Sequence, residues 1–384
     1  MTGMLMDLYG PPMGNLVRGS GVYLFDEEGR RYLDFLSGIA VTSLGHNHPV
    51  IHEAVVSQLT RVWHTSNFFT TPSSLRAAER IGEIAPFADA RVFFCNSGAE
   101  AIESALKLVR RACPDRPKIA TLSGSFHGRT LGALSATMQP RKRQPFEPLL
   151  TGFVEVPFND ALAMREITAD PEVGAVLFEP ILGEAGVLPL EDGFAQALID
   201  AQRDHGVLLV SDEIQTGLCR TGEWLGCSYY GIVPDAFTLA KALGNGVPIG
   251  ALVAKPELAA TMLVGDHGST FGGNPLATAA AAAVIEFMEQ ASLRERVRHL
   301  GDLALPLLKP LSGVTKVDGR GLMFGLALAA PVAPEVMQEA FSSGLILNAP
   351  TPSRLRLLPP LIISEPELKQ GIDILGGVLE RRFG

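Results

Sequence analysis

Short apolar runs alternate with helical stretches through the middle of the chain. Strand-type runs occupy residues 91–95, 118–122, 153–156, 175–178, 207–210 and 236–239. The stretch after the first run repeats apolar residues at the spacing of one helix face, at Ile102, Ala105, Leu106 and Val109. Strands that are apolar on both faces and alternate with helices are typical of a parallel sheet covered by helices on both sides. The pattern therefore predicts an α/β fold with a mostly parallel sheet.

The two ends of the chain follow other patterns. Residues 20–35 hold two short alternating runs around an acidic turn at 26–29, which predicts a hairpin with Gly29 in its turn. Beyond about residue 290 we expect a charged helix over 293–300, strands over 314–318 and 322–329, and a last helix over 366–382. This order predicts a large domain over residues 52–288, a smaller α+β domain over 289–384, and an N-terminal segment, 1–51, that packs with the smaller domain.

Composition and charge narrow the classes of partner. Hydrophobic residues make up 47% of the 384 residues and charged residues 19%, which is ample for a large buried core. Lys and Arg number 32 against 41 Asp and Glu, a net charge of −9, so no nucleic-acid surface with a basic excess is expected. The one basic cluster, residues 141–143, is followed closely by Pro and Phe and is interpreted as a solvated loop.

The cysteines and the hydropathy of the chain indicate the cellular compartment in which the protein is expected. The four cysteines form no C-x-x-C pair and are expected as free thiols in a reducing compartment. Residues 1–16 lack the basic and apolar segments of a secretory signal, and no uncharged apolar run reaches the ~18–20 residues of a membrane span. We therefore expect a cytoplasmic protein with no membrane segment.

Polar residues follow several of the predicted strands, at the edge where an open parallel sheet binds ligands. Run 91–95 is followed by Asn96, Ser97, Gly98, Ala99 and Glu100 at the start of a helix. Ser97 and Glu100 have the spacing of a capping box, a plain structural explanation. The free N–H groups of such a helix start, with Gly98 allowing close approach, also suit a phosphate. The sequence leaves both interpretations open at this point.

Two further strand ends carry an acid and an amine. Asp212 follows run 207–210, and a buried carboxylate needs a cationic or hydrogen-bonding partner. Lys241 follows run 236–239 and stands just before two glycines, at 244 and 246, that leave room for a ligand. Taken alone, a lysine there is most simply a solvated strand end. Together, the phosphate cradle, the carboxylate and the lysine match what pyridoxal 5′-phosphate needs: an amine for its aldehyde, an anion for its ring nitrogen and a pocket for its phosphate.

The sequence does not match the motifs of three other kinds of ligand site: a P-loop, a dinucleotide-binding loop and a metal site. A P-loop requires Gly-Lys, and no lysine of this chain follows a glycine. The glycines at 244, 246 and 250 miss the dinucleotide fingerprint by one position and precede an apolar run instead of a helix. The histidines at 46, 48 and 52 stand around a proline and suggest a structured turn, so no metal site is expected.

Eight longer motifs stand in one order along the chain. They are SGIAVTSLGHNHP from Ser37, FCNSGAEA from Phe94, SFHGRTLGALS from Ser125, EPILGEAG from Glu179, SDEIQTGLCRTG from Ser211, TLAKALGNGVPIGA from Thr238, GSTFGGNPLA from Gly268 and RLLPPL from Arg356. With them the chain resembles, over nearly its whole length, the class-III (subgroup II) pyridoxal-phosphate aminotransferases of fold type I. Among these it is most similar to the acetylornithine aminotransferases.

The resemblance implies a role for each cofactor residue. Lys241 would bond covalently to the cofactor and then move a proton, and Asp212 would pair with the ring nitrogen. The remaining contacts would be Ser97, Gly98 and Ala99 to the phosphate, Phe126 and Ile214 on the two ring faces, Gln215 to the phenolic oxygen, and Thr270 to the phosphate from the other subunit. Because Thr270 would act across an interface, a homodimer is implied.

The resemblance also implies how substrate is held. Arg356 would clamp the α-carboxylate in bidentate fashion, while Arg129, with Ser269 nearby, would address the acylated end. Glu184 would pair with Arg356 when an ω-amine is processed and release it for glutamate. Ile39, where ornithine aminotransferases usually have tyrosine, is the acetylornithine-type residue. Structural ion pairing is the alternative for both arginines.

The reaction that follows from this resemblance is a ping-pong transamination. N2-acetylornithine would give its δ-amino group to the cofactor and 2-oxoglutarate would take it, yielding N-acetylglutamate 5-semialdehyde and glutamate, a step of arginine biosynthesis. Another ω-aminotransferase, acting on 4-aminobutyrate, ornithine, succinyl-diaminopimelate or carrier-linked lysine, is the alternative, since one pocket substitution shifts discrimination by only ~1–3 kcal/mol. A non-catalytic cofactor-binding regulator is disfavoured because Lys241 and both arginines are present.

Overall fold

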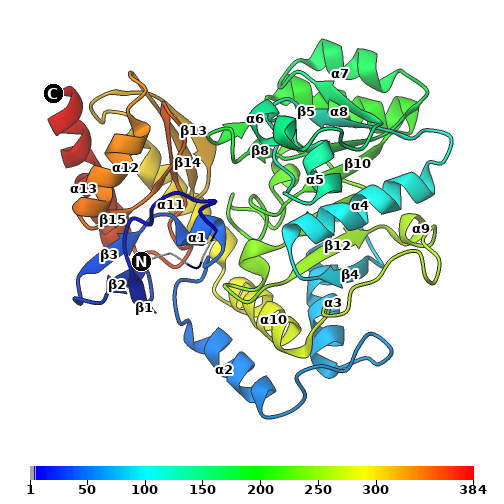
Figure 1. Ribbon diagram of the computed structural model, residues 1–384, viewed down its shortest axis with the longest axis horizontal. Helices are drawn as coiled ribbons and strands as arrows, with labels where there is room; N and C mark the ends of the chain where they lie inside the picture. The colour runs from blue at the N-terminus through cyan, green and yellow to red at the C-terminus, as the bar shows by residue number, and fades with distance from the viewer. Residues whose placement is uncertain (1–3, 5) are drawn as a thin grey trace.

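The computed structural model describes residue 4 and residues 6–384, and its largest sheet has the strand order β4-β12-β11-β10-β7-β5-β6 (Figure 1). Its strands are β4 (Arg91–Cys95), β5 (Lys118–Leu122), β6 (Phe153–Val156), β7 (Val173–Phe178), β10 (Leu208–Asp212), β11 (Ala236–Leu239) and β12 (Gly250–Ala254). Neighbours pair in parallel except β12, which runs antiparallel to both β11 and β4. The predicted mostly parallel sheet is confirmed.

Side chains of this sheet alternate between two hydrophobic clusters. Ile119 and Val210 pack with the helix α4 (Gly98–Ala112), whereas the adjacent Ala120 and Leu209 belong to the cluster on the other face. That second cluster includes buried residues of α3 (Pro72–Ile84), α8 (Asp192–His205) and α10 (Pro275–Gln290). Successive strand residues point to opposite faces, so a strand must be apolar throughout when helices cover both sides. Burial on both faces is therefore the reason that the strand sequences are continuously apolar.

Two four-stranded sheets lie at the other end of the molecule, beside both chain ends (Figure 1). One holds β1 (Leu16–Ser20), β2 (Tyr23–Asp26), β3 (Arg31–Asp34) and β15 (Leu345–Ile346). The other holds β13 (Val314–Arg320), β14 (Met323–Leu328), β17 (Arg354–Leu357) and β16 (Asn348–Thr351). The predicted hairpin is confirmed as the antiparallel pair β2–β3, and β3 pairs in parallel with β15. The domain boundaries at 51/52 and 288/289 stay predictions.

Helices and short turns complete the chain. A two-stranded ribbon joins β8 (Ile181–Leu182) and β9 (Leu188–Pro189). The other helices are α1 (Ser37–Ala40), α2 (Pro49–Leu59), α5 (Leu131–Ala136), α6 (Pro140–Arg143), α7 (Ala161–Thr168), α9 (Pro256–Ala259), α11 (Leu293–Leu308), α12 (Ala333–Ser342) and α13 (Glu365–Phe383). Three 3₁₀ turns are η1 (Gln144–Phe146), η2 (Gly226–Tyr230) and η3 (Lys241–Leu243).

The described residues contain no single helix that is long and apolar enough to cross a membrane. Only α10 and α11 taken together reach that length and composition, and they meet at an angle of 66°. Ten residues of α10 are buried, including Ala281 and Val284, because the helix packs against α2 and α3. The four cysteines, Cys95, Cys113, Cys219 and Cys227, are free.

Candidate active site

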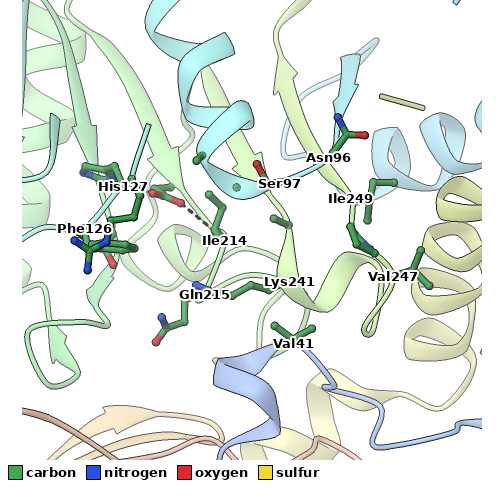
Figure 2. Close-up of a pocket in the computed structure, with 18 of the residues that line it drawn as sticks. Val41, Asn96, Ser97, Phe126, His127, Ile214, Gln215, Lys241, Val247 and Ile249 are labelled. Carbon is green, nitrogen blue, oxygen red and sulfur yellow. Dashed lines mark hydrogen bonds and ion pairs between the residues drawn. The ribbon is translucent and has the colours of Figure 1, made fainter. Parts of the chain in front are cut away.

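A cavity of about 440 Å³ opens at the carboxyl edge of the large sheet (Figure 2). Segments that follow β4, β5, β7, β10 and β11 all contribute to its wall. Nine predicted site residues line it: Ser97, Gly98, Ala99, Phe126, Arg129, Asp212, Ile214, Gln215 and Lys241. The strand-end principle therefore located the cavity correctly from the sequence.

Strand register sets Lys241 close to Asp212. Asp212 ends β10 and stands opposite Thr238 of the parallel strand β11, and Lys241 follows two residues after β11 ends. The Lys241 backbone has φ +44°, in the left-handed region that costs a non-glycine residue about 1–3 kcal/mol. Burial lowers the pKa of Lys241, although the carboxylates of Asp212 and Glu184 oppose that shift. A lysine with a lowered pKa is more often a free amine, which is the form that attacks a carbonyl.

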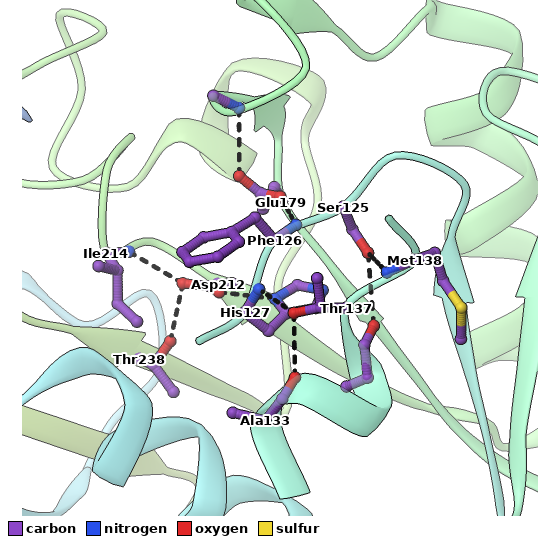
Figure 3. A network of polar contacts seen from close by, with 12 residues as sticks. Ser125, Phe126, His127, Ala133, Thr137, Met138, Glu179, Asp212, Ile214 and Thr238 are labelled. Carbon is purple, nitrogen blue, oxygen red and sulfur yellow. Dashed lines mark hydrogen bonds and ion pairs between the residues drawn. The ribbon is translucent and has the colours of Figure 1, made fainter. Parts of the chain in front are cut away.

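Asp212 sits in a closed polar network (Figure 3). His127 Nδ1 lies 2.7 Å from Asp212 Oδ2, and both side chains are buried. Thr238 Oγ1 and the Ile214 backbone N–H each donate to Asp212 Oδ1, at 3.2 Å. Because the carboxylate accepts three hydrogen bonds from donors that are fixed by the fold, it is held in one orientation at the cavity wall.

Glu179 is a second buried acid on the cavity wall. It follows β7 and accepts hydrogen bonds from the backbone N–H groups of Phe126, at 2.8 Å, and Gly183, at 3.2 Å. Burial raises the pKa of Glu179 to about 7, against the nearby charge of His127, while Asp212 adds to the shift. The side chain thereby fixes the backbone beneath the Phe126 ring.

The start of α4 forms one end of the cavity. Ser97 Oγ accepts from the Glu100 N–H at 3.2 Å, so Ser97 is the N-cap of α4. The Glu100 carboxylate accepts from the Asn96 N–H at 2.8 Å instead of from the Ser97 N–H, so only half of the predicted capping box forms. A helix start leaves its first N–H groups without partners inside the helix. A Cβ built on Gly98 would lie only 2.8 Å from Ile214 Cδ1, so a larger residue would clash with the cavity wall.

Arg356 lies behind Gln215 and is 1% exposed. Its Nη1 donates to Glu184 Oε1 at 2.6 Å, to the Gly183 carbonyl at 3.1 Å and to Gln215 Oε1 at 3.2 Å, and its Nε donates to Asn348 at 3.0 Å. No hydrogen bond engages Nη2 within the described part of the chain. Burial raises the pKa of Glu184, but the charge and hydrogen bond of Arg356, together with the charges of Lys142 and Lys241, outweigh burial, and the net shift is downward.

Two cationic side chains, Arg129 and Lys142, lie near the ring of Phe126, which lines the cavity. Arg129 is exposed, lies 5.7 Å from the Phe126 ring centroid, and makes no ion pair among the described residues. Lys142, on α6, lies 4.4 Å from the same ring centroid, with Nζ 3.9 Å from Glu184 Oε2. The prediction that residues 141–143 form a solvated loop is therefore wrong for Lys142, because the short helix α6 turns its side chain onto Phe126.

Five predicted residues lie outside the cavity lining: Arg356 and Glu184, described above, and Ser269, Thr270 and Ile39. Ser269 Oγ accepts from Asn96 Nδ2 at 3.1 Å, which places Ser269 one residue behind the wall. Thr270 is exposed and lines a small separate hollow. Ile39 packs in a small hydrophobic cluster that includes Leu358, while Val41, two residues on, reaches the cavity.

Sequence reasoning did not assign several residues of the wall: Val41, Asn96, His127, Gly128, Glu179, Ala240, Gly246, Val247, Pro248 and Ile249. His127 stands next to Phe126 in one of the long motifs, and Glu179 directly follows a predicted strand. A buried carboxylate needs a hydrogen-bonding or cationic partner, and this rule could have predicted the contact between His127 and Asp212.

Comparison with known proteins supports the same chemistry. Residues 8–379 match the family Aminotransferase class-III. The acetylornithine aminotransferase of Gloeobacter violaceus is 48% identical over 376 residues, which cover 95% of this chain and 92% of that protein. The acetylornithine aminotransferase of Archaeoglobus fulgidus is 43% identical over 358 residues, 93% of each chain.

Solved structures agree with these relatives. The ornithine aminotransferase from Toxoplasma gondii superposes with a TM-score of 0.94 at 30% identity, covering 99% of this chain and 93% of that one. The N-acetylornithine aminotransferase from Stenotrophomonas maltophilia gives 0.85 at 35% identity, covering 100% and 99%. The chain belongs to the class-III aminotransferases. It is a pyridoxal-phosphate-dependent transaminase that takes an amino donor and a keto acid.

The cavity suits that cofactor. It combines a helix start for the phosphate, a buried carboxylate for a ring nitrogen and a lysine with a lowered pKa. Phe126 and Ile214 supply apolar contact for a flat ring between these polar groups. The phosphate, ring nitrogen, aldehyde and flat ring of the cofactor would therefore each find a suitable protein group in the wall of this one cavity.

Proposed function

We propose that this chain transfers the δ-amino group of N2-acetylornithine to 2-oxoglutarate, giving N-acetylglutamate 5-semialdehyde and glutamate in arginine biosynthesis. The names of its relatives indicate this reaction for those proteins. The observation that carries the proposal is the placement of two arginines near one cavity. Arg129 lines the cavity and makes no ion pair among the described residues, while Arg356 lies outside the lining and is bonded to Glu184 and to the lining residue Gln215. The identity of 42–48% to relatives named acetylornithine aminotransferase supports the same donor.

The cofactor supplies an electron sink that stabilises negative charge on the substrate carbon. Lys241 would hold the cofactor through its amine, and Asp212 would keep the ring nitrogen protonated. When substrate is bound, the Lys241 Nζ would accept a proton from the substrate carbon that carries the amine and pass it on as a general acid. The lowered pKa of Lys241 supports this role, because only the free amine accepts a proton.

The other proposed contacts hold the cofactor in place. Ser97, Gly98 and Ala99 bind the phosphate with backbone and hydroxyl groups at the start of α4. Gln215 donates to the phenolic oxygen through its Nε2, since its Oε1 already accepts from Arg356. Phe126 and Ile214 enclose the ring and exclude water from its two faces.

Substrate carboxylates meet the two arginines. Arg129, assisted by Ser269, binds the carboxylate-bearing acylated end of the donor, while Glu184 keeps Arg356 occupied. With 2-oxoglutarate, Glu184 leaves and Arg356 clamps the α-carboxylate, for which its unengaged Nη2 is suited. Ile39 leaves room for the acyl group at this end.

A homodimer completes the proposed site. Thr270 is exposed and lies outside the cavity wall of its own chain, so its proposed phosphate contact requires a second subunit. Exposed apolar side chains occur near Thr270 in sequence, Val264 and Phe271 among them, and burying them in an interface is favourable.

A substrate panel tests the donor. We expect kcat/KM with 2-oxoglutarate as acceptor to be highest for N2-acetylornithine, above ornithine, 4-aminobutyrate and N-succinyl-diaminopimelate. A clear preference for unacylated ornithine would overturn the assignment, because Arg129 and Ile39 would then have no acyl group to accommodate. Comparable rates for succinylated donors would widen the substrate class without changing the reaction.

A further inference from the structure

Glu184 has two cations within 4 Å among the described residues. Its Oε1 lies 2.6 Å from Arg356 Nη1, and its Oε2 lies 3.9 Å from Lys142 Nζ. The first contact is a short charge-assisted hydrogen bond, and the second is a loose ion pair. The two oxygens of one carboxylate therefore point at different cations, Arg356 at 1% exposure and Lys142 at 23% exposure.

A substrate carboxylate that binds Arg356 must take the place of Glu184. Two carboxylates on one guanidinium repel each other, and a carboxylate that loses its counter-ion in a partly buried site is costly. The Glu184 side chain is 24% exposed, so water alone replaces only part of that interaction. The exchange on Arg356 thus requires another favourable position for the Glu184 carboxylate.

Lys142 is placed to provide that position. Its ammonium lies over the Phe126 ring, 4.4 Å from the centroid, and its side chain is 23% exposed. Closing the gap from 3.9 Å to a normal charge-assisted distance of about 2.8 Å needs a shift of only about 1 Å. Arg141, the preceding residue of α6, is exposed instead.

We propose that Lys142 is the second cationic partner of Glu184 and holds its carboxylate whenever a substrate carboxylate occupies Arg356. Lys142 is then a positioning residue that acts through Glu184 and favours the half-reaction of 2-oxoglutarate and glutamate. Burial lowers the pKa of Lys142 while the charge of Glu184 raises it, so a closer Glu184 stabilises the charged ammonium. This inference rests on the proposed exchange of Arg356 between Glu184 and substrate.

The two half-reactions can be followed separately as single turnovers of the cofactor-loaded enzyme. For Lys142→Met we expect the 2-oxoglutarate concentration at half-maximal rate to rise about 10-fold, and that for N2-acetylornithine to change less than about 2-fold. The dissociation constant of glutarate, an unreactive dicarboxylate measured by calorimetry, should also rise about 10-fold. Lys142→Arg should restore both values. Arg141→Met, which removes an equal charge from α6, should leave them unchanged.

A double variant distinguishes whether Lys142 acts on substrate through Glu184 or contacts substrate directly. In a Glu184→Gln background the effect of Lys142→Met should disappear, because Lys142 has no carboxylate left to hold. An effect that persists there would overturn the proposal and make Lys142 a direct substrate contact. Equal losses in both half-reactions, or none in either, would also overturn it. Wild-type turnover of N2-acetylornithine reports on the proposed function, whereas only ratios of variant to wild type report on Lys142.

Discussion

His127 Nδ1 and Asp212 Oδ2 lie 2.7 Å apart in the wall of the cavity, and neither side chain is more than 4% exposed. A carboxylate oxygen only accepts, so Nδ1 carries the hydrogen of this bond. His127 Nε2 is buried and has no partner among the described residues. The only engaged nitrogen of the ring is thus the one that orients Asp212.

Replacing His127 should weaken the site through Asp212. A hydrogen bond to a charged group contributes about 1.5–3 kcal/mol, so His127→Leu should lower kcat about 10- to 100-fold. The pH at which the bound cofactor changes its absorbance should shift as well, which a merely structural role would not produce. His127→Asn, which keeps an N–H donor, should recover part of the loss. An unchanged absorbance profile in both variants would contradict this role.

Lys241→Ala should abolish covalent attachment of the cofactor. Borohydride reduction of the wild-type enzyme followed by peptide mass spectrometry should find the cofactor on the peptide that contains residue 241, and on no peptide of the variant. The rate should fall about 100- to 10,000-fold, the contribution of a positioned general base. Lys369→Ala removes an exposed lysine and serves as the control. Unchanged trapping in Lys241→Ala would show that another amine is used.

Glu179 should make stability depend on pH. Its folded-state pKa of about 7 lies above the usual value of 4.5, so the folded state retains its proton to higher pH than the unfolded state. The contribution is fully present below about pH 4.5 and is lost as pH rises through 7, by about 3 kcal/mol. Urea midpoints at pH 5 and pH 7.5 should show this fall in the wild type.

Glu179→Gln cannot ionise and should flatten that part of the pH dependence. It should also lower stability at pH 5 by about 1 kcal/mol, because one of the two backbone N–H groups loses its acceptor. Glu191→Gln changes an exposed glutamate and should keep the wild-type profile. The same pH dependence in Glu179→Gln and wild type would assign the effect to another group.

The strand ends were predictable because burial on both faces makes these strands apolar throughout. The boundary of run 236–239 coincides with β11, and this alone places Lys241 at the correct edge. Parallel register then brings Asp212 opposite Thr238 without further information. At these strands the local sequence pattern and the tertiary packing favour the same structure, which is why the sequence alone predicts their ends.

Other features depend on contacts between distant segments. The helix predicted over 293–300 extends to Leu308, through Pro306, because Ala304 and Leu308 are buried and their packing outweighs the lost hydrogen bond. The direction of Lys142 depends on Phe126, and the pairing of β3 with β15 joins residues more than 300 positions apart. No local periodicity encodes such contacts.

Arg129 should bind the carboxylate-bearing end of the donor. Arg129→Gln removes the charge at the cavity mouth and should raise KM for N2-acetylornithine about 10- to 100-fold, the range of one charged hydrogen-bonding contact. Unacylated ornithine carries the same α-carboxylate, so its KM should rise by a similar factor. Arg141→Met removes a nearby exposed charge and should leave both KM values at the wild-type level. An unchanged KM for N2-acetylornithine in Arg129→Gln would place Arg129 elsewhere in the mechanism.

Mixed dimers test whether Thr270 acts across an interface. Thr270→Ala alone should weaken cofactor binding about 10- to 100-fold, as expected for one hydrogen bond to a phosphate. A hybrid of one Lys241→Ala subunit and one Thr270→Ala subunit then contains a site with both Lys241 and Thr270, provided that each site takes Thr270 from the other subunit. Such hybrids, purified with two different tags, should recover about half the wild-type activity at limiting cofactor. If both residues acted within one chain, every site of the hybrid would carry a lesion and no recovery would occur.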